Sequence, residues 1–387
     1  MIQAGSNLET EWSLLEASCS EDLSGERTEH VRQLLQSPIQ WKTLLTLADQ
    51  HGLQPLLYQT LSKVADKVPP AELLSLQQAH EVNLHKSLFL SRELIRIIDH
   101  LRSAGIDVLP YKGPALAEMY YGDIALRPSG DIDLLILQPD LPRIREAVRQ
   151  LGYVPHWSLT PHQERAFLRA GYECAFDGPS GPNLLELQWA LQPKFYSVDF
   201  DMGGLFSRAV ATSIAGYEVK TPSAEDQLLI LSLHASKHVW GRLIWLSDVA
   251  RVMNTPKLDW GWIASQAIEL GIVRILRVSA ELADRLLGKP IPVGLNERLP
   301  SDPFAEMLAQ EIETRIRQHS GYDVESFEYF RLMLRLRERQ IDRLRFVSRL
   351  AFTPGPSEWE AIRLPQSLSP LYRLVRLSRL TAKIVRR

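Results

Sequence analysis

The stretch Arg127-Pro-Ser-Gly-Asp-Ile-Asp-Leu-Leu-Ile136 is the part of the sequence on which the fold prediction rests. The apolar residues that follow the two aspartates predict a buried strand over 131–137. Residues two apart on a strand project from the same face, so Asp131 and Asp133 are expected to point into one site. Two close carboxylates repel each other, and a divalent cation between them offsets that cost. Because Mg²⁺ prefers hard oxygen ligands, the pair predicts a site for Mg²⁺ or Mn²⁺.

An Asp-x-Asp pair alone is weak evidence, because it also occurs in loops and helix caps, but the residues before it add a turn that suits phosphate binding. Residues 106–111 predict a short buried strand, and a helix is expected over 115–121. Between them, Gly113 lets the backbone approach a phosphate, whose charge the helix N-terminus attracts. Arg127 is expected either to pair with a phosphate or to hold Asp133.

The hydrophobic pattern divides the chain into four parts and predicts an α+β fold. Helical spacing prevails at both ends, whereas the middle alternates strands and helices that would form a small mixed sheet. The first part, 1–100, is an N-terminal helical region, and 101–222 is the catalytic core. A helical domain follows over 223–350. The last part, 351–387, is a proline-rich linker with a basic amphipathic helix.

Composition limits the possible function classes. With 387 residues, 45% hydrophobic and 23% charged, the chain is long enough for several folded units of a globular protein. A net charge of -2 gives no overall attraction to nucleic acid or membrane. Cys19 and Cys174 lack the spacing of a thiolate zinc site or a disulfide scaffold. No signal peptide or membrane-spanning apolar run is found, so a cytoplasmic protein is predicted.

The order of these segments resembles a known superfamily. Strand, glycine turn, helix and an Arg-x-x-x-Asp-x-Asp strand is the layout of the DNA polymerase β nucleotidyltransferases. More narrowly, four segments resemble an uncharacterised nucleotidyltransferase family (NTP transferase 5-like), often encoded near peptide natural-product genes: 111–117, 127–133, 185–189 and 234–248. The resemblance implies a polymerase β-type core that binds ATP or another NTP and transfers a nucleoside monophosphate to an acceptor, releasing pyrophosphate.

The superfamily also implies a third carboxylate on a neighbouring strand, as a second metal ligand or general base. Glu186 is the preferred candidate, because a carboxylate among strand apolars is costly without a partner. Glu173 alternates similarly and is the alternative. Where the superfamily has Gly-Ser or Gly-Gly, this chain has Lys112-Gly113, so Lys112 is expected to contact the phosphates as a point charge. Gln188 stands where related sequences tend to have histidine.

A polar stripe on a predicted helix offers a second set of candidates. His234, Lys237 and His238 lie at i, i+3 and i+4 and therefore share one helix face. One interpretation is a polar face or a contact between domains. The other is a helix that closes over the nucleotide, with Lys237 on the triphosphate and His234 or His238 orienting phosphate or acceptor. Two histidines at this spacing without a protease motif are weak evidence for zinc.

The acceptor is not determined by these residues. A peptide natural product or small metabolite is the leading hypothesis, and RNA, as in related transfer-RNA-modifying toxins, is the second. RNA would require a basic, aromatic-lined groove beside Asp131. A third hypothesis is a degenerate relative that binds nucleotide or a partner without chemistry. Residues 361–387 carry seven Lys or Arg and no Asp or Glu, which predicts a helix that packs on the body or contacts an acidic partner, namely anionic membrane, RNA or peptide.

Overall fold

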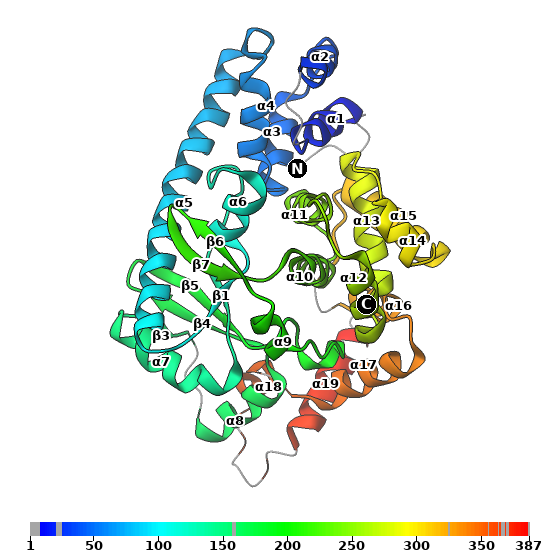
Figure 1. Cartoon of the computed structure of the whole chain (residues 1–387). Helices are drawn as coiled ribbons and strands as arrows, with labels where there is room; N and C mark the ends of the chain where they lie inside the picture. Colours follow the sequence, from blue (N-terminus) through cyan, green and yellow to red (C-terminus); the bar gives the residue numbers. More distant parts are fainter. Residues whose placement is uncertain are drawn as a thin grey trace.

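A small mixed sheet lies in the middle of the chain, with helices around it (Figure 1). The computed structural model describes residues 8–20, 25–156, 160–323, 326–354, 356–362, 364, 368 and 371–385. The sheet has the spatial order β1-β2-β5-β4-β3; β2 and β5 are parallel and the other neighbours antiparallel. Its strands are β1 (Leu109–Pro110), β2 (Ile132–Leu135), β3 (Val154–Pro155), β4 (Glu173–Gly178) and β5 (Gly181–Gln188).

Two helices cover the sheet through apolar residues at helical spacing. Helix α7 (Leu141–Gln150) buries Leu141, Ile144 and Val148. The last third of the long helix α5 (Pro70–Ser103) buries a matching row against the same cluster: Leu90, Leu94, Ile97, Ile98 and Leu101. Such rows form one apolar stripe on a helix of 3.6 residues per turn. The smaller elements around the sheet are η2 (Gln138–Asp140), α6 (Gly113–Tyr121), α8 (Pro161–Ala170), η3 (Lys194–Tyr196), α9 (Met202–Ser207) and the hairpin β6 (Val210–Ile214) with β7 (Tyr217–Thr221).

The helical regions at the two ends of the sequence share one hydrophobic core. Leu14 and Leu15 of the first helix belong to the same buried cluster as Leu246, Leu276 and Leu308. Figure 1 shows the N-terminal helices beside α11 and α13. The N-terminal helices are α1 (Glu9–Ser18), α2 (Gly25–Leu34), α3 (Trp41–Gln50), α4 (Gln54–Ser62) and η1 (Ala65–Lys67). The later ones are α10 (Ala224–Lys237), α11 (Leu243–Met253), α12 (Trp260–Leu270), α13 (Val273–Leu287), α14 (Val293–Arg298), α15 (Pro303–Arg317), α16 (Phe327–Arg335) and α17 (Gln340–Phe352).

The α+β class predicted from the hydrophobic pattern is confirmed, with differences in individual elements. The expected strand over 106–111 is reduced to the two residues of β1. Helix α8 was not predicted, although a capping box of Thr160 and Gln163 and a proline at its start mark its beginning. The hairpin β6-β7 was also not predicted; its turn uses left-handed residues, Ala215 and Gly216.

The C-terminal part packs on the body rather than extending from it. Helix α19 (Tyr372–Val385) contacts α17 and α18 (Pro356–Ala361). Glu358 of α18 pairs with Arg376 at 3.2 Å and Arg379 at 3.0 Å. The predicted linker residues Gly355, Pro365 and Pro370 and the last two arginines of the predicted basic helix (386–387) lie outside the described residues. Among the described helices, none is both long and apolar enough to cross a membrane.

Candidate active site

The parallel pairing of β2 with β5 places the predicted carboxylates together. Asp133 lies directly beside Glu186 in the strand register, and Asp131 immediately precedes β2. Asp133 is only 5% exposed, whereas Asp131 and Glu186 are partly buried. Glu173, the alternative third carboxylate, lies on the next strand, where its register partner is Gln188. The sequence placed these residues on strands, and the sheet order makes Glu186 the immediate neighbour of Asp133.

A hydrogen-bond network connects the carboxylates through Gln188. Its amide nitrogen lies 3.3 Å from Asp133 Oδ1 and 3.2 Å from Glu186 Oε2, and donates to both. Its amide oxygen accepts from the Tyr111 hydroxyl at 2.6 Å. Lys112 donates from Nζ to Asp133 Oδ1 at 3.1 Å. Gln188 therefore links Asp133, Glu186 and Tyr111 in one network.

Asp131 and Glu186 hold their protons more strongly than free carboxyl groups do, because their pKa values are raised. Burial, with the charge of Asp133 as the second cause, raises the pKa of Asp131 to about 6. Burial, followed by repulsion from Asp133 and Glu173, raises the pKa of Glu186 to about 8. Each shift means that a negative charge in this cluster is unfavourable without added positive charge. The site therefore attracts cations.

The donor set fits a divalent metal, although the side chains are not arranged around one. Within the described ranges, no three His, Cys, Asp or Glu side chains stand close enough together to hold a metal ion as they are. The ammonium of Lys112 pairs with Asp133 at a position that a metal cation could occupy. Carboxylate oxygens from adjoining strands, with pKa values raised by burial and then by mutual repulsion, are the hard ligands that Mg²⁺ or Mn²⁺ prefers. A divalent cation and Lys112 would compete for Asp133 Oδ1.

The predicted glycine turn lies directly against the aspartates. Gly113 begins α6 with φ of +57°, a left-handed conformation that L side chains rarely adopt. A Cβ at this position would lie 3.3 Å from Ser129 Oγ and 3.5 Å from the Asp131 carbonyl oxygen. The turn therefore brings the backbone of Lys112 and Gly113 close to the segment that carries Asp131.

Replacing Gly113 with alanine tests whether this close approach matters. Gly113→Ala is expected to lower nucleotide transfer about 10- to 100-fold, because a small displacement next to reacting groups is costly. Gly122→Ala is the matched control, since Gly122 is also left-handed, at φ +70°, but a Cβ there meets nothing within 4 Å. Both variants should lose about 1 to 2 kcal/mol of stability from backbone strain. Equal loss of transfer in the two would contradict the assignment.

Arg127 has a partner that the sequence did not predict. Its guanidinium forms a two-pronged ion pair with Asp248 of α11, with both N–O distances 2.8 Å. The Tyr121 hydroxyl also donates to Asp248, at 2.7 Å. Arg127 and Asp248 are buried, so this pair fastens the core segment to the helical region. The alternative that Arg127 holds Asp133 is therefore corrected: Arg127 donates to Asp248 instead.

Breaking this pair should destabilise the protein. Asp248→Asn leaves the buried Arg127 charge without a counter-charge, which is expected to cost about 3 to 5 kcal/mol of unfolding free energy. The control is Glu146→Gln, which removes one partner of the exposed pair with Arg149 and should leave that free energy almost unchanged. Urea unfolding followed by circular dichroism measures both. Similar midpoints for the two variants would show that the buried pair does not fasten the core.

Lys237, from the polar stripe predicted on α10, reaches the carboxylate side. Lys237 donates to the Tyr172 hydroxyl at 3.0 Å, and that hydroxyl donates to the Glu173 carboxylate. Burial lowers the pKa of Lys237, and the charge of Glu173 opposes this shift. Glu173 is therefore engaged by Tyr172, whereas Glu186 faces Asp133.

His234 and His238 form an aromatic cluster with Trp245. Their ring centroids lie 4.8 Å from each other and 5.5 and 5.0 Å from the Trp245 centroid. Burial lowers the pKa of His234 well below its usual value and that of His238 to about 3. Both imidazoles are therefore neutral at physiological pH. Packing explains these two residues at least as well as phosphate binding does.

Several site residues escaped the sequence prediction. Gln188 shares a strand face with Glu186, which was a visible signal of its place beside the carboxylates. Ser129, Tyr172 and Asp248 carry no comparable local signal. Their roles depend on contacts with residues far along the chain, such as the 121-residue separation between Arg127 and Asp248.

The fold and the site define an α+β chain with a carboxylate cluster on two parallel strands beside a glycine turn. This chain belongs to the family described as uncharacterised nucleotidyltransferase, whose family model matches residues 37–288. The resemblance found in the sequence, which covers roughly residues 40 to 290, is thereby confirmed over nearly the same range. Neither the search of curated proteins nor the search of solved structures found a match.

Proposed function

We propose that this protein is a metal-dependent nucleotidyltransferase with a polymerase β-type core, which transfers a nucleoside monophosphate from an NTP to an acceptor hydroxyl. The observation that carries the proposal is the register that puts Asp133 beside Glu186 on parallel strands, with Asp131 just before them. The membership of this chain in a nucleotidyltransferase family supports the reaction class. A strand, glycine turn and helix ahead of the aspartates support the polymerase β-type layout.

The proposed reaction forms one bond and breaks one bond. The acceptor oxygen attacks the α-phosphorus of the NTP, the bond from that phosphorus to the bridging oxygen breaks, and pyrophosphate leaves. The hydroxyl proton passes to a carboxylate of the cluster, for which Glu186 is the proposed group. Asp131, Asp133 and Glu186 would hold Mg²⁺ or Mn²⁺, which when bound neutralises charge on the phosphate oxygens.

The remaining residues of the site would position the substrates. Gly113 and the start of α6 let backbone N–H groups face the phosphates. Lys112, which pairs with Asp133, would contact the phosphates as a point charge. Gln188 keeps Asp133 and Glu186 in place through its two donated hydrogen bonds. The Arg127 ion pair holds the segment ahead of Asp131 in place and is a supporting contact.

Isotope position in the NTP tests the reaction class. The protein is incubated with Mg²⁺ or Mn²⁺, a cell extract and each NTP labelled either at the α- or at the γ-phosphate. Nucleotidyl transfer labels a macromolecule or metabolite from the α-label alone, because the γ-phosphate leaves with pyrophosphate. Label from the γ-position would indicate phosphoryl transfer and contradict the proposal. Binding of NTP without transfer under any condition would instead indicate a catalytically degenerate nucleotide-binding protein.

Lys237 is the proposed contact that closes over the triphosphate. Lys237→Met is expected to weaken NTP binding about 10-fold, since one hydrogen bond to a charged group contributes roughly 1.5 to 3 kcal/mol. Tyr172→Phe is the control, because it removes the hydroxyl that Lys237 contacts and keeps the ammonium. Equilibrium binding of a non-hydrolysable NTP measures both. Wild-type affinity in Lys237→Met would remove Lys237 from the site.

A further inference from the structure

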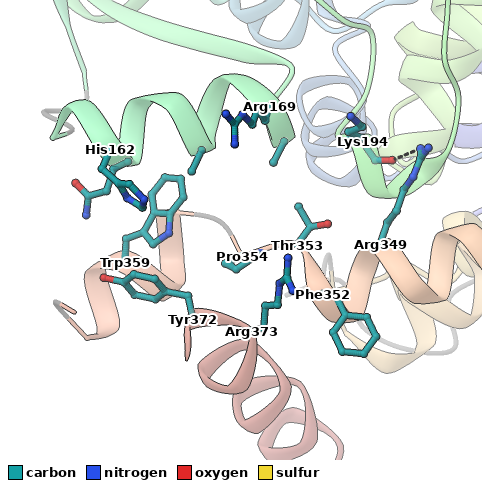
Figure 2. A pocket seen from close by; sticks show the side chains of 13 residues that line it. His162, Arg169, Lys194, Arg349, Phe352, Thr353, Pro354, Trp359, Tyr372 and Arg373 are labelled. Atoms are coloured by element: carbon teal, nitrogen blue, oxygen red, sulfur yellow. Dashed lines mark hydrogen bonds between the residues drawn. The ribbon is translucent and has the colours of Figure 1, made fainter. Parts of the chain in front are cut away.

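A basic, aromatic-walled pocket is lined by the end of α8, three residues before Glu173. Its volume is about 520 Å³, within the range of roughly 300 to 1,000 Å³ that is usual for ligand sites. Helix α8 forms one side, and the end of α17 with α18 and α19 forms the other (Figure 2). Among the described residues, the lining contains four Arg or Lys and no Asp or Glu: Arg169, Lys194, Arg349 and Arg373.

The charges of this pocket are only partly neutralised. Arg349 donates to the Lys194 carbonyl at 2.9 Å and lies 3.6 Å from Asp199, which is 72% exposed. Arg169 and Arg373 are exposed and form no ion pair with any residue in the described parts of the chain. Figure 2 shows them on opposite sides of the hollow. In a chain whose net charge is only -2, this grouping produces a local attraction for anions.

The walls between these charges are aromatic. Trp359 and Tyr372 line the pocket and are 6% and 5% exposed, so their rings form a fixed wall. The Tyr372 hydroxyl is held by the Leu364 amide, which donates to it at 2.9 Å. Phe352, at 52% exposure, and His162 offer further ring surface at the edges. Cations combined with ring surfaces are the combination that binds the phosphates and bases of single-stranded nucleic acid.

The chain connects the pocket to the carboxylates over a short distance. Ala170, the last residue of α8, lines the pocket, and only Gly171 and Tyr172 separate it from Glu173. Three residues of chain span at most about 11 Å. The Trp189 indole donates to the Gly171 carbonyl at 3.1 Å and fixes this connection to the strand that carries Glu186. The lining of the pocket therefore ends three residues before Glu173, at the edge of the carboxylate cluster.

We infer that this pocket binds single-stranded nucleic acid and presents its terminal hydroxyl to the carboxylates as the acceptor. The transfer to this hydroxyl rests on the proposed function, whereas the binding of nucleic acid does not. The terminal oxygen bonds to the α-phosphorus of the NTP, pyrophosphate leaves, and the proton passes to the carboxylate cluster. This makes nucleic acid, rather than a peptide or small metabolite, the acceptor class.

Fluorescence anisotropy with fluorescein-labelled 12-nucleotide RNA and DNA of one sequence tests the binding, using the full chain without NTP. Arg169→Gln/Arg373→Gln is expected to weaken binding at least 10-fold. It should also reduce the slope of log affinity against log salt by about 1.4, because each phosphate contact on a single strand contributes about 0.7. The matched control is Arg92→Gln/Arg298→Gln, which removes the same charge from exposed positions outside the pocket. That control should bind within about twofold of wild type.

The outcomes separate this inference from the proposed function. Binding of either oligonucleotide with the expected dependence on Arg169 and Arg373 supports the inference, and tighter RNA binding would show a contact with the 2′-hydroxyl. The inference is overturned if the control variant loses as much oligonucleotide affinity as the pocket variant, or if wild type binds no oligonucleotide at low salt. It is also overturned if the pocket binds an acidic peptide but no oligonucleotide. An RNA ending in a 3′-deoxynucleotide should bind but accept no label. If α-label reaches another acceptor while oligonucleotides do not bind, only the inference fails. If oligonucleotides bind and no label moves, only the proposed function fails.

Discussion

Asp133→Asn is expected to lower nucleotidyl transfer by at least about a thousandfold, which corresponds to roughly 4 kcal/mol of transition-state stabilisation. The substitution preserves the shape of the side chain and the oxygen that accepts from Lys112 and Gln188. It removes the charge that a divalent cation requires. Transfer of α-label from NTP to the acceptor measures the effect. Asp131→Asn is expected to act similarly, because its carboxylate belongs to the same cluster.

The stability of the variant distinguishes loss of chemistry from loss of folding. Removing the Asp133 charge relieves the repulsion that raises the pKa of Asp131 and of Glu186. The same substitution also takes the counter-charge from the ammonium of Lys112. The two effects oppose each other, so the metal-free Asp133→Asn protein should melt close to the wild-type temperature. Mn²⁺ should raise the melting temperature of wild type and not that of the variant, since a ligand stabilises only the state it binds. Full transfer activity in Asp133→Asn would exclude the proposed site.

Glu186→Gln is expected to lower transfer about a hundredfold or more, whereas Glu173→Gln should lower it less than tenfold. Glu186 lies beside Asp133 in the parallel register. Glu173 lies one strand further and accepts a hydrogen bond from Tyr172. The two substitutions are chemically identical and only about one strand spacing apart, so each serves as the control for the other. The measurement is the rate of α-label transfer at saturating NTP.

The reverse order of effects would reassign the third carboxylate. Full activity in Glu186→Gln together with a large loss in Glu173→Gln would make Glu173 the catalytic group and Glu186 a neighbour. Gln188 provides a further check, because it donates to both Asp133 and Glu186. Gln188→Leu should reduce transfer without removing any carboxylate. A variant of Gln188 with wild-type rates would show that this bridge does not position the site.

Local patterns in the sequence were sufficient for the parts of the site that lie on one element or on adjacent elements. Asp131 and Asp133 are two residues apart, and the alternation of a strand alone places them on one face. Gly113 begins a helix, and its left-handed backbone is possible because glycine has no side chain. Helical spacing predicted most of the helices. Where the elements were short, as in β1, tertiary pairing rather than local preference set the boundaries.

The sequence by itself determined the aspartate strand, the glycine turn and the family, because these depend on residues close together in the chain. Tertiary structure alone decided that Glu186 rather than Glu173 borders Asp133, since strand order is a property of the whole sheet. It also decided that Arg127 pairs with Asp248 and that Arg169 and Arg373 face one pocket. Such contacts join segments more than a hundred residues apart, and their free energy comes from burial and charge pairing that no local pattern encodes.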